Sequence, residues 1–119
     1  MKHWQREAKG SLTMAKAGLR EGEYGMALFH CHLAIEKALK AAYMQKHDED
    51  HPYTHDLLEI ALLLKKEWTP AQKKIFLELT DYAIAARYSD PAWAERHATE
   101  SNTRKWVDVT ERFLATFLP

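Results

Sequence analysis

Two charged residues, Glu36 and Lys40, stand one helical turn apart in a segment that is otherwise rich in alanine and leucine. Side chains four positions apart on a helix are neighbours, so these two can form an ion pair worth roughly a few tenths of a kcal/mol in solvent. On a helical wheel, however, both lie close to the apolar cluster of Met26, Phe29 and Leu33. The spacing therefore leaves two interpretations open, a solvated surface pair and a polar group beside an interface.

A second candidate is the dipeptide Arg87-Tyr88, which directly precedes an expected helix end at Asp90-Pro91. The structural interpretation is a basic side chain that compensates the negative end of the helix dipole. The functional interpretation is phosphate binding, because the planar guanidinium group of Arg87 can donate two parallel hydrogen bonds to phosphate oxygens. The ring of Tyr88 could then stack on a base.

The histidines are the usual metal ligands to consider, and three of the seven recur every four residues: His47, His51 and His55. On a continuous helix this spacing could build a metal site, but Pro52 and an acidic loop interrupt it. His30 and His32 are two positions apart and point in different directions on a helix. We therefore expect no metal site and no other cofactor.

The remaining residue types exclude several kinds of chemistry. The single cysteine, Cys31, lies among apolar residues and is expected to be a core side chain rather than a nucleophile. We find no Ser-His-Asp arrangement, glycine-rich phosphate loop or HExxH spacing. The net charge is zero, which argues against a broad phosphate-binding surface but permits a local basic pocket.

The elements that must position these residues are predicted to be helices. The 119 residues include only four glycines and four prolines, fewer than an all-β fold usually needs. Apolar residues at spacings of three and four predict helices over about 4–19, 24–46, 55–67, 70–88 and 91–117. The length suits a single domain over residues 1–119. We therefore expect an all-α fold, an antiparallel up-and-down bundle of four to five helices.

Local signals mark the helix boundaries. Gly22 can adopt a positive φ in the turn between the first two helices. Thr54 or Asp56 can cap the third helix. The segment Thr69-Pro70-Ala71-Gln72 combines an N-cap, a proline in the first turn and a capping box. Ser89-Asp90-Pro91 repeats the cap-then-proline pattern before the last helix.

The helix predicted over 24–46 is apolar on two sides. Its main stripe consists of Tyr24, Ala27, Leu28, Cys31, Ile35, Ala38, Leu39 and Ala42. Met26, Phe29 and Leu33 form a second cluster on roughly the opposite side. Such a helix is either central in the bundle or shared between the core and a subunit interface. We therefore name Met26, Phe29 and Leu33 as the candidate dimer interface.

The cellular location of the protein can also be predicted from the sequence. The N-terminal segment 1–10 is polar and lacks the apolar core of a signal peptide. The longest aliphatic run, 60–64, is too short to span a bilayer. We expect a cytoplasmic protein that does not interact with a membrane.

Several segments together resemble the HEPN domain, a helical family found in prokaryotes and higher eukaryotes. The matching blocks are Gly22-Glu23-Tyr24-Gly25-Met26-Ala27-Leu28-Phe29-His30-Cys31-His32, Ala34-Ile35-Glu36-Lys37-Ala38-Leu39-Lys40-Ala41, Tyr53-Thr54-His55-Asp56-Leu57 and Ala86-Arg87-Tyr88-Ser89-Asp90. Their order and spacing match the family over nearly the whole chain. The resemblance implies a small prokaryotic protein with an antiparallel helical bundle, usually a homodimer. It also implies the candidate ligand-binding positions, which are Glu36, Lys40, His55, Arg87 and Tyr88.

The resemblance implies a function as well. Many family members are ribonucleases, often toxins, with an arginine followed four to six residues later by a histidine; no arginine here has that partner. We therefore expect a dimeric module that binds a nucleotide or RNA and acts with a nucleotidyltransferase-like protein, as in toxin–antitoxin systems, and we assign no catalytic residue. Two alternatives stay open: a divergent ribonuclease that pairs Arg87 with His55 or His97, and a structural dimer without a ligand.

Overall fold

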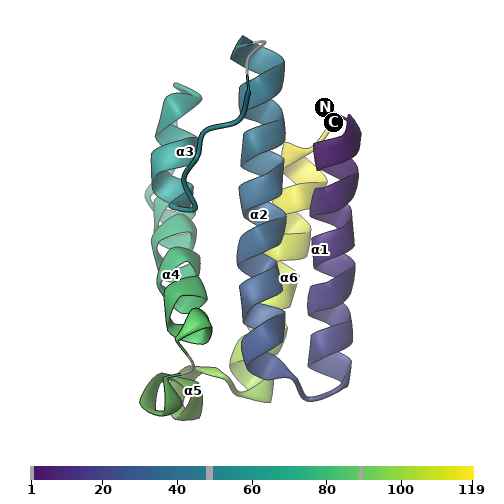
Figure 1. Ribbon diagram of the computed structural model, residues 1–119, viewed down its shortest axis with the longest axis vertical. Coiled ribbons are helices and arrows are strands. Elements are labelled where there is room, and N and C mark those ends of the chain that lie inside the picture. Colours follow the sequence, from purple (N-terminus) through teal and green to yellow (C-terminus); the bar gives the residue numbers. More distant parts are fainter. Residues whose placement is uncertain (1, 48–49, 89) are drawn as a thin grey trace.

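The computed structural model describes residues 2–47, 50–88 and 90–119, and these residues form six helices and no strand (Figure 1). The helices are α1 (Lys2–Arg20), α2 (Tyr24–His47), α3 (Leu57–Leu63), α4 (Pro70–Arg87), α5 (Pro91–His97) and α6 (Glu100–Phe117). The long helices α1, α2, α4 and α6 alternate in direction along the long axis, and α5 lies across one end (Figure 1). The prediction of an all-α antiparallel bundle is confirmed.

α2 is the central helix of the bundle. It packs against α1, α3, α4 and α6, and its 24 residues, about 36 Å of helix at 1.5 Å per residue, extend along most of the 41 Å long axis. This position buries most of the main apolar stripe, whereas Met26 of the second cluster is exposed and Phe29 and Leu33 are partly exposed. Neither α2 nor any other described helix combines the length and the apolar character needed to cross a membrane.

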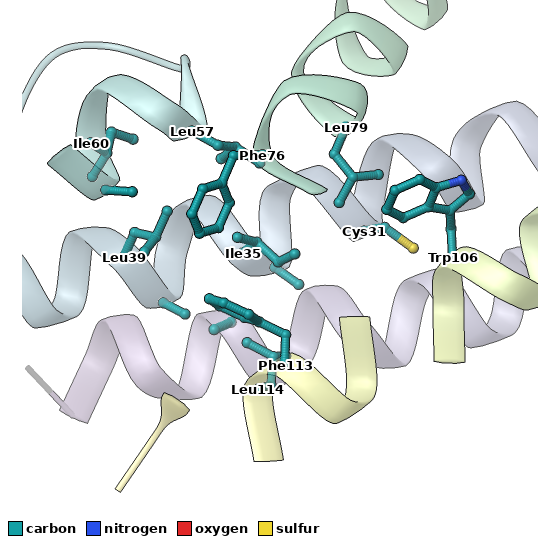
Figure 2. Packing of buried hydrophobic residues seen from close by; sticks show 14 of the residues in the cluster. Cys31, Ile35, Leu39, Leu57, Ile60, Phe76, Leu79, Trp106, Phe113 and Leu114 are labelled. Carbon is teal, nitrogen blue, oxygen red and sulfur yellow. The ribbon is translucent and has the colours of Figure 1, made fainter. Parts of the chain in front are cut away.

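The core is a cluster of buried side chains contributed chiefly by α2, α4 and α6. Figure 2 shows Ile35 and Leu39 of α2 close to Phe76 of α4 and Phe113 of α6. The two phenylalanine rings meet edge to face, with centroids 5.8 Å apart and planes at 89°, a geometry that aromatic rings favour. Burying each such side chain contributes about 1.5–3 kcal/mol, so this cluster holds the helices together.

Small residues bring α1 close to α2. Ala8, Ser11 and Ala15 are the buried residues of α1. At the end of α1, a Cβ added to Gly18 would lie 3.0 Å from the Cβ of Ala27, closer than the neighbouring helix allows. The following turn contains Gly22 with a φ of 77°, as predicted.

Most predicted helix starts are confirmed. Thr69 and Gln72 form the complete capping box, with Pro70 in the first turn. The side chain of Asp90 caps α5, and that of Asp56, rather than Thr54, caps α3 by accepting a hydrogen bond from the Glu59 backbone. Ser89 of the cap-then-proline pattern lies outside the described residues, as do Asp48 and Glu49, which belong to the acidic loop that interrupts the histidine spacing.

Two predicted boundaries are wrong. The segment 91–117 is divided between His97 and Glu100 because the Thr99 side chain caps a new helix by accepting from the Asn102 backbone. The Asn102 side chain also donates to the His97 carbonyl at 2.8 Å, which closes the end of α5. α3 ends at Leu63 rather than near residue 67, and the Trp68 indole folds back to donate to the Ala61 carbonyl at 2.9 Å.

Candidate ligand site

A buried ion pair forms the base of the candidate site. Glu36 and Lys40 are only 5% and 4% exposed, and Lys40 Nζ lies 2.9 Å from Glu36 Oε2. The same oxygen accepts a hydrogen bond from His55 Nδ1, also at 2.9 Å. The interpretation of Glu36 and Lys40 as a solvated surface pair is therefore wrong, because α3, α4 and the segment before α3 exclude water from this side of α2.

A fourth side chain, His32, belongs to the same cluster. It is 3% exposed, and its Nε2 lies 2.8 Å from the His55 carbonyl oxygen. Because a carbonyl can only accept, Nε2 carries the hydrogen, and Nδ1 of the neutral ring is an acceptor. Nδ1 lies 3.6 Å from Glu36 Oε1, and neither atom has a hydrogen-bond partner. Sequence analysis missed this role of His32, although its position one turn before Glu36 was the available signal.

Burial and charge shift the pKa values of this cluster. Burial tends to raise the pKa of Glu36, but the hydrogen bonds from Lys40 and His55, together with the charge of Lys40, hold it below its ordinary value. Burial is the largest effect on His32 and lowers its pKa, against the opposing effects of the His55 carbonyl and the Glu36 carboxylate. The arrangement therefore favours an ionised Glu36 beside a neutral His32.

His32, Glu36 and His55 of this cluster line a cavity of about 260 Å³. Apolar side chains of α2 and α4 form its walls: Phe29, Leu33, Ala83 and Ile84. His55, Asp56, Thr80 and Arg87 complete the lining. The cavity thus combines apolar walls, a buried polar end and an exposed arginine, features typical of small-molecule sites.

Local contacts hold the segment before α3 against this cavity. The Asp56 side chain caps α3, and the Leu57 backbone N–H donates to Thr80 Oγ1 of α4 at 3.1 Å. With the hydrogen bond from His32 to the His55 carbonyl, three successive residues, 55–57, are each held by a hydrogen bond. The His55 side chain can therefore reach Glu36 while remaining 68% exposed.

The structure brings some of the predicted residues together and separates others. Glu36, His55 and Arg87 line one cavity, whereas Lys40 contacts the carboxylate of Glu36 and is not part of the lining. Tyr88 is 74% exposed at the end of α4 and does not line the cavity either.

The candidate dimer interface lies next to this site. Met26 is 54% exposed, and Phe29 and Leu33 are partly exposed beside it. Phe29 and Leu33 also line the cavity, and a smaller hollow of about 150 Å³ joins Met26 and Phe29 to Arg87. The predicted interface and the predicted ligand site are therefore adjacent.

Other reactive residues lie elsewhere. Cys31 is fully buried, and burial raises the pKa of its thiol to about 11, which agrees with a core role. His97 packs against the rings of Tyr82 and Trp93 and does not line the cavity. Among the described residues, no group of three or more His, Cys, Asp or Glu side chains is arranged so that it could hold a metal ion.

Fold and site together define a small helical-bundle protein with a polar-ended cavity beside its central helix. Residues 1–118 match the HEPN domain family, and the chain therefore belongs to this family. The crystal structure of TT1696 from Thermus thermophilus is similar, with 25% identity and a TM-score of 0.83 over 96% of this chain and 92% of that chain. A search of curated proteins found no match.

Proposed function

We propose that this HEPN protein is a nucleotide- or RNA-binding module that acts as a homodimer. The main support for the proposal is the cavity, which is lined by exposed Arg87 and by the buried side chain of Glu36. A guanidinium group suits a phosphate, and partly apolar walls that include the Phe29 ring suit a base. A nucleotide presents both of these groups in one molecule.

The exposed apolar side chains beside the cavity support self-association. Met26 on α2 and Ile84 on α4 are 54% and 52% exposed, and partly exposed Phe29 and Leu33 join them. Large apolar side chains gathered on one surface commonly mark a protein interface. A two-fold axis through this surface would place two cavities next to each other.

A nucleotidyltransferase-like partner, as in toxin–antitoxin systems, is the part of the proposal that rests on the family resemblance. A gene for such a protein beside the gene for this chain would support it. Co-purification of the two proteins after co-expression would test the partnership directly, and separate elution of both would contradict it.

The first experiment is a thermal-shift series with adenine and guanine nucleotides. Binding to the folded state stabilises it by mass action and so raises the Tm. At a ligand concentration of 100 times Kd, the free energy of unfolding increases by about 2.7 kcal/mol. We expect a shift that disappears in Arg87→Ala. Arg104→Ala is the matched control, because Arg104 is an exposed arginine of α6 that pairs with Glu100, outside the cavity. Absence of a shift with every nucleotide would reject the proposal in favour of a purely structural dimer.

A second candidate function, a divergent ribonuclease, is favoured by one observation. His55 Nδ1 donates to Glu36, so the carboxylate orients the ring and leaves Nε2 available for proton transfer. Arg87 lines the same cavity and could bind the scissile phosphate. RNA cleavage by the wild type that is lost in both His55→Ala and Arg87→Ala, at unchanged Tm, would establish this function.

A further inference from the structure

A chain of rings connects the segment between α2 and α3 with the start of α1. The Tyr53 ring contacts the His51 ring, with centroids 5.2 Å apart, and the His51 ring contacts the Trp4 indole at 5.0 Å. Trp4 and His51 are half-buried, whereas Tyr53 is 87% exposed. The outer ring of this chain is therefore open to solvent.

Core packing does not account for Tyr53. Its exposed side chain buries little apolar surface, so it contributes little to the stability of the fold. Its position is nevertheless held by two contacts, the His51 ring and a hydrogen bond from its hydroxyl group to the Asp50 carboxylate at 2.9 Å. A ring that is held in place before binding loses little conformational entropy when a ligand stacks on it. An exposed ring of this kind suits the stacking of a nucleic-acid base.

The exposed ring is close to the cavity of the proposed ligand site. Tyr53 precedes His55, which lines the cavity, by two residues, so their Cα atoms are at most about 7 Å apart. Figure 1 shows this segment running from the end of α2 back along the bundle to the start of α3. Successive stacked nucleotides rise about 3.4 Å along one strand. A strand with one nucleotide in the cavity can therefore place a nearby base on the Tyr53 ring.

We infer that Tyr53, supported by His51 and Trp4, is a stacking platform for single-stranded RNA whose neighbouring nucleotide occupies the cavity. This inference rests on the function proposed above and decides between its two ligand classes, a free nucleotide and RNA. Stacking uses the face of a base, which every base has, so the platform does not select a sequence. The net charge of zero agrees with recognition through rings rather than through many phosphate contacts.

The test compares AMP with single-stranded tetra-adenylate RNA by isothermal titration calorimetry. The wild type should bind tetra-adenylate about tenfold more tightly than AMP, because stacking of one further base contributes a factor of this size. Tyr53→Ala should remove this advantage and leave the affinity for AMP unchanged. Tyr53→Phe should keep the advantage, because the ring remains. Tyr53→Leu is the matched control, an apolar side chain without a ring, and should behave like Tyr53→Ala.

The outcomes separate this inference from the proposed function. Equal binding of AMP and tetra-adenylate by the wild type would overturn the inference and leave nucleotide binding intact. An advantage of tetra-adenylate that persists in Tyr53→Ala would also overturn it, because the additional nucleotides would then bind elsewhere. Binding of neither ligand would overturn both. Because Tyr53 is exposed, all three variants should fold with the Tm of the wild type, which the same samples can verify.

Discussion

Two neighbouring strips of α2 differ in how the polarity of their side chains relates to burial. On the core strip, Leu28, Ile35 and Leu39 are completely buried, as packing alone would require. On the adjacent strip, His32, Glu36 and Lys40 are also buried, whereas apolar Met26 nearby is 54% exposed. Buried charge and exposed apolar surface both cost free energy, and proteins accept such costs mainly where they serve a function. The contrast therefore supports the proposed placement of the ligand site on this side of α2.

The largest expected effect comes from removing one partner of the buried ion pair. Glu36→Ala leaves Lys40 buried without a counter-charge, which should lower the free energy of unfolding by about 3–5 kcal/mol. Urea denaturation monitored by circular dichroism would measure this loss. The matched control is the double variant Glu36→Leu with Lys40→Met, in which both charges are removed and most of the stability should return. A double variant as unstable as Glu36→Ala would show that the charges are not the cause.

On the core strip, the effect should arise from packing alone. Leu28→Ala creates a cavity in the core and should cost about 2–5 kcal/mol, independent of pH. Met26→Ala on the exposed side is the comparison, and should change the stability by no more than about 0.5 kcal/mol. Similar losses for the two variants in the same urea experiment would contradict the division of α2 into a buried and an exposed side.

The polar strip should also make the stability dependent on pH. Burial lowers the pKa of His32 from its ordinary value of 6.5, so the unfolded chain takes up the proton first as the pH falls. Stability from the neutral ring is therefore complete above pH 6.5 and is lost as the pH falls through the lower pKa of the folded state. Glu36, with its pKa also lowered, adds a second loss below its ordinary value of 4.5.

Urea midpoints between pH 7.5 and 5 would test this dependence. His32→Asn should flatten the curve. His30→Asn is the comparison, because the pKa of His30 on the same helix is also lowered, by burial and by Lys37, so this variant measures the part of the pH dependence that arises outside the Glu36 cluster. A curve that flattens only in His30→Asn would place the titrating group outside the site.

A small effect on stability, but the largest on assembly, is expected for Leu33→Glu. Leu33 is only partly buried, so the folded monomer should tolerate the charge at a cost of about 1 kcal/mol or less. Light scattering coupled to size exclusion should show monomers, because a charge in an apolar interface is strongly unfavourable. A variant that stays dimeric and folded would move the interface away from Met26, Phe29 and Leu33. An unfolded variant would place Leu33 in the core.

Much of the fold could be predicted from local sequence. The capping box at Thr69 and the cap at Asp90 lie within three or four residues of the helix starts that they define. The same kind of signal at Thr99, in the weakly apolar part of the last segment, was overlooked, and two helices were predicted as one. The family assignment, which combined several short blocks, is confirmed.

The candidate site could be predicted only in part. Glu36, His55 and Arg87 were predicted from the sequence, and all three line the cavity. The role of His32 was missed because its only local signal was the spacing to Glu36, which the apolar pattern of α2 obscured.

The sequence by itself determined where helices form, because caps, turns and apolar periodicity act over a few neighbouring residues. Only the tertiary structure decided that Glu36 is buried and shares one carboxylate oxygen between Lys40 and His55, which lies 19 positions further along the chain. The reason is that burial depends on how α3 and α4 exclude water from α2, a property of the packed bundle that no segment has alone. The unpaired acceptors beside the cavity arise from the same packing.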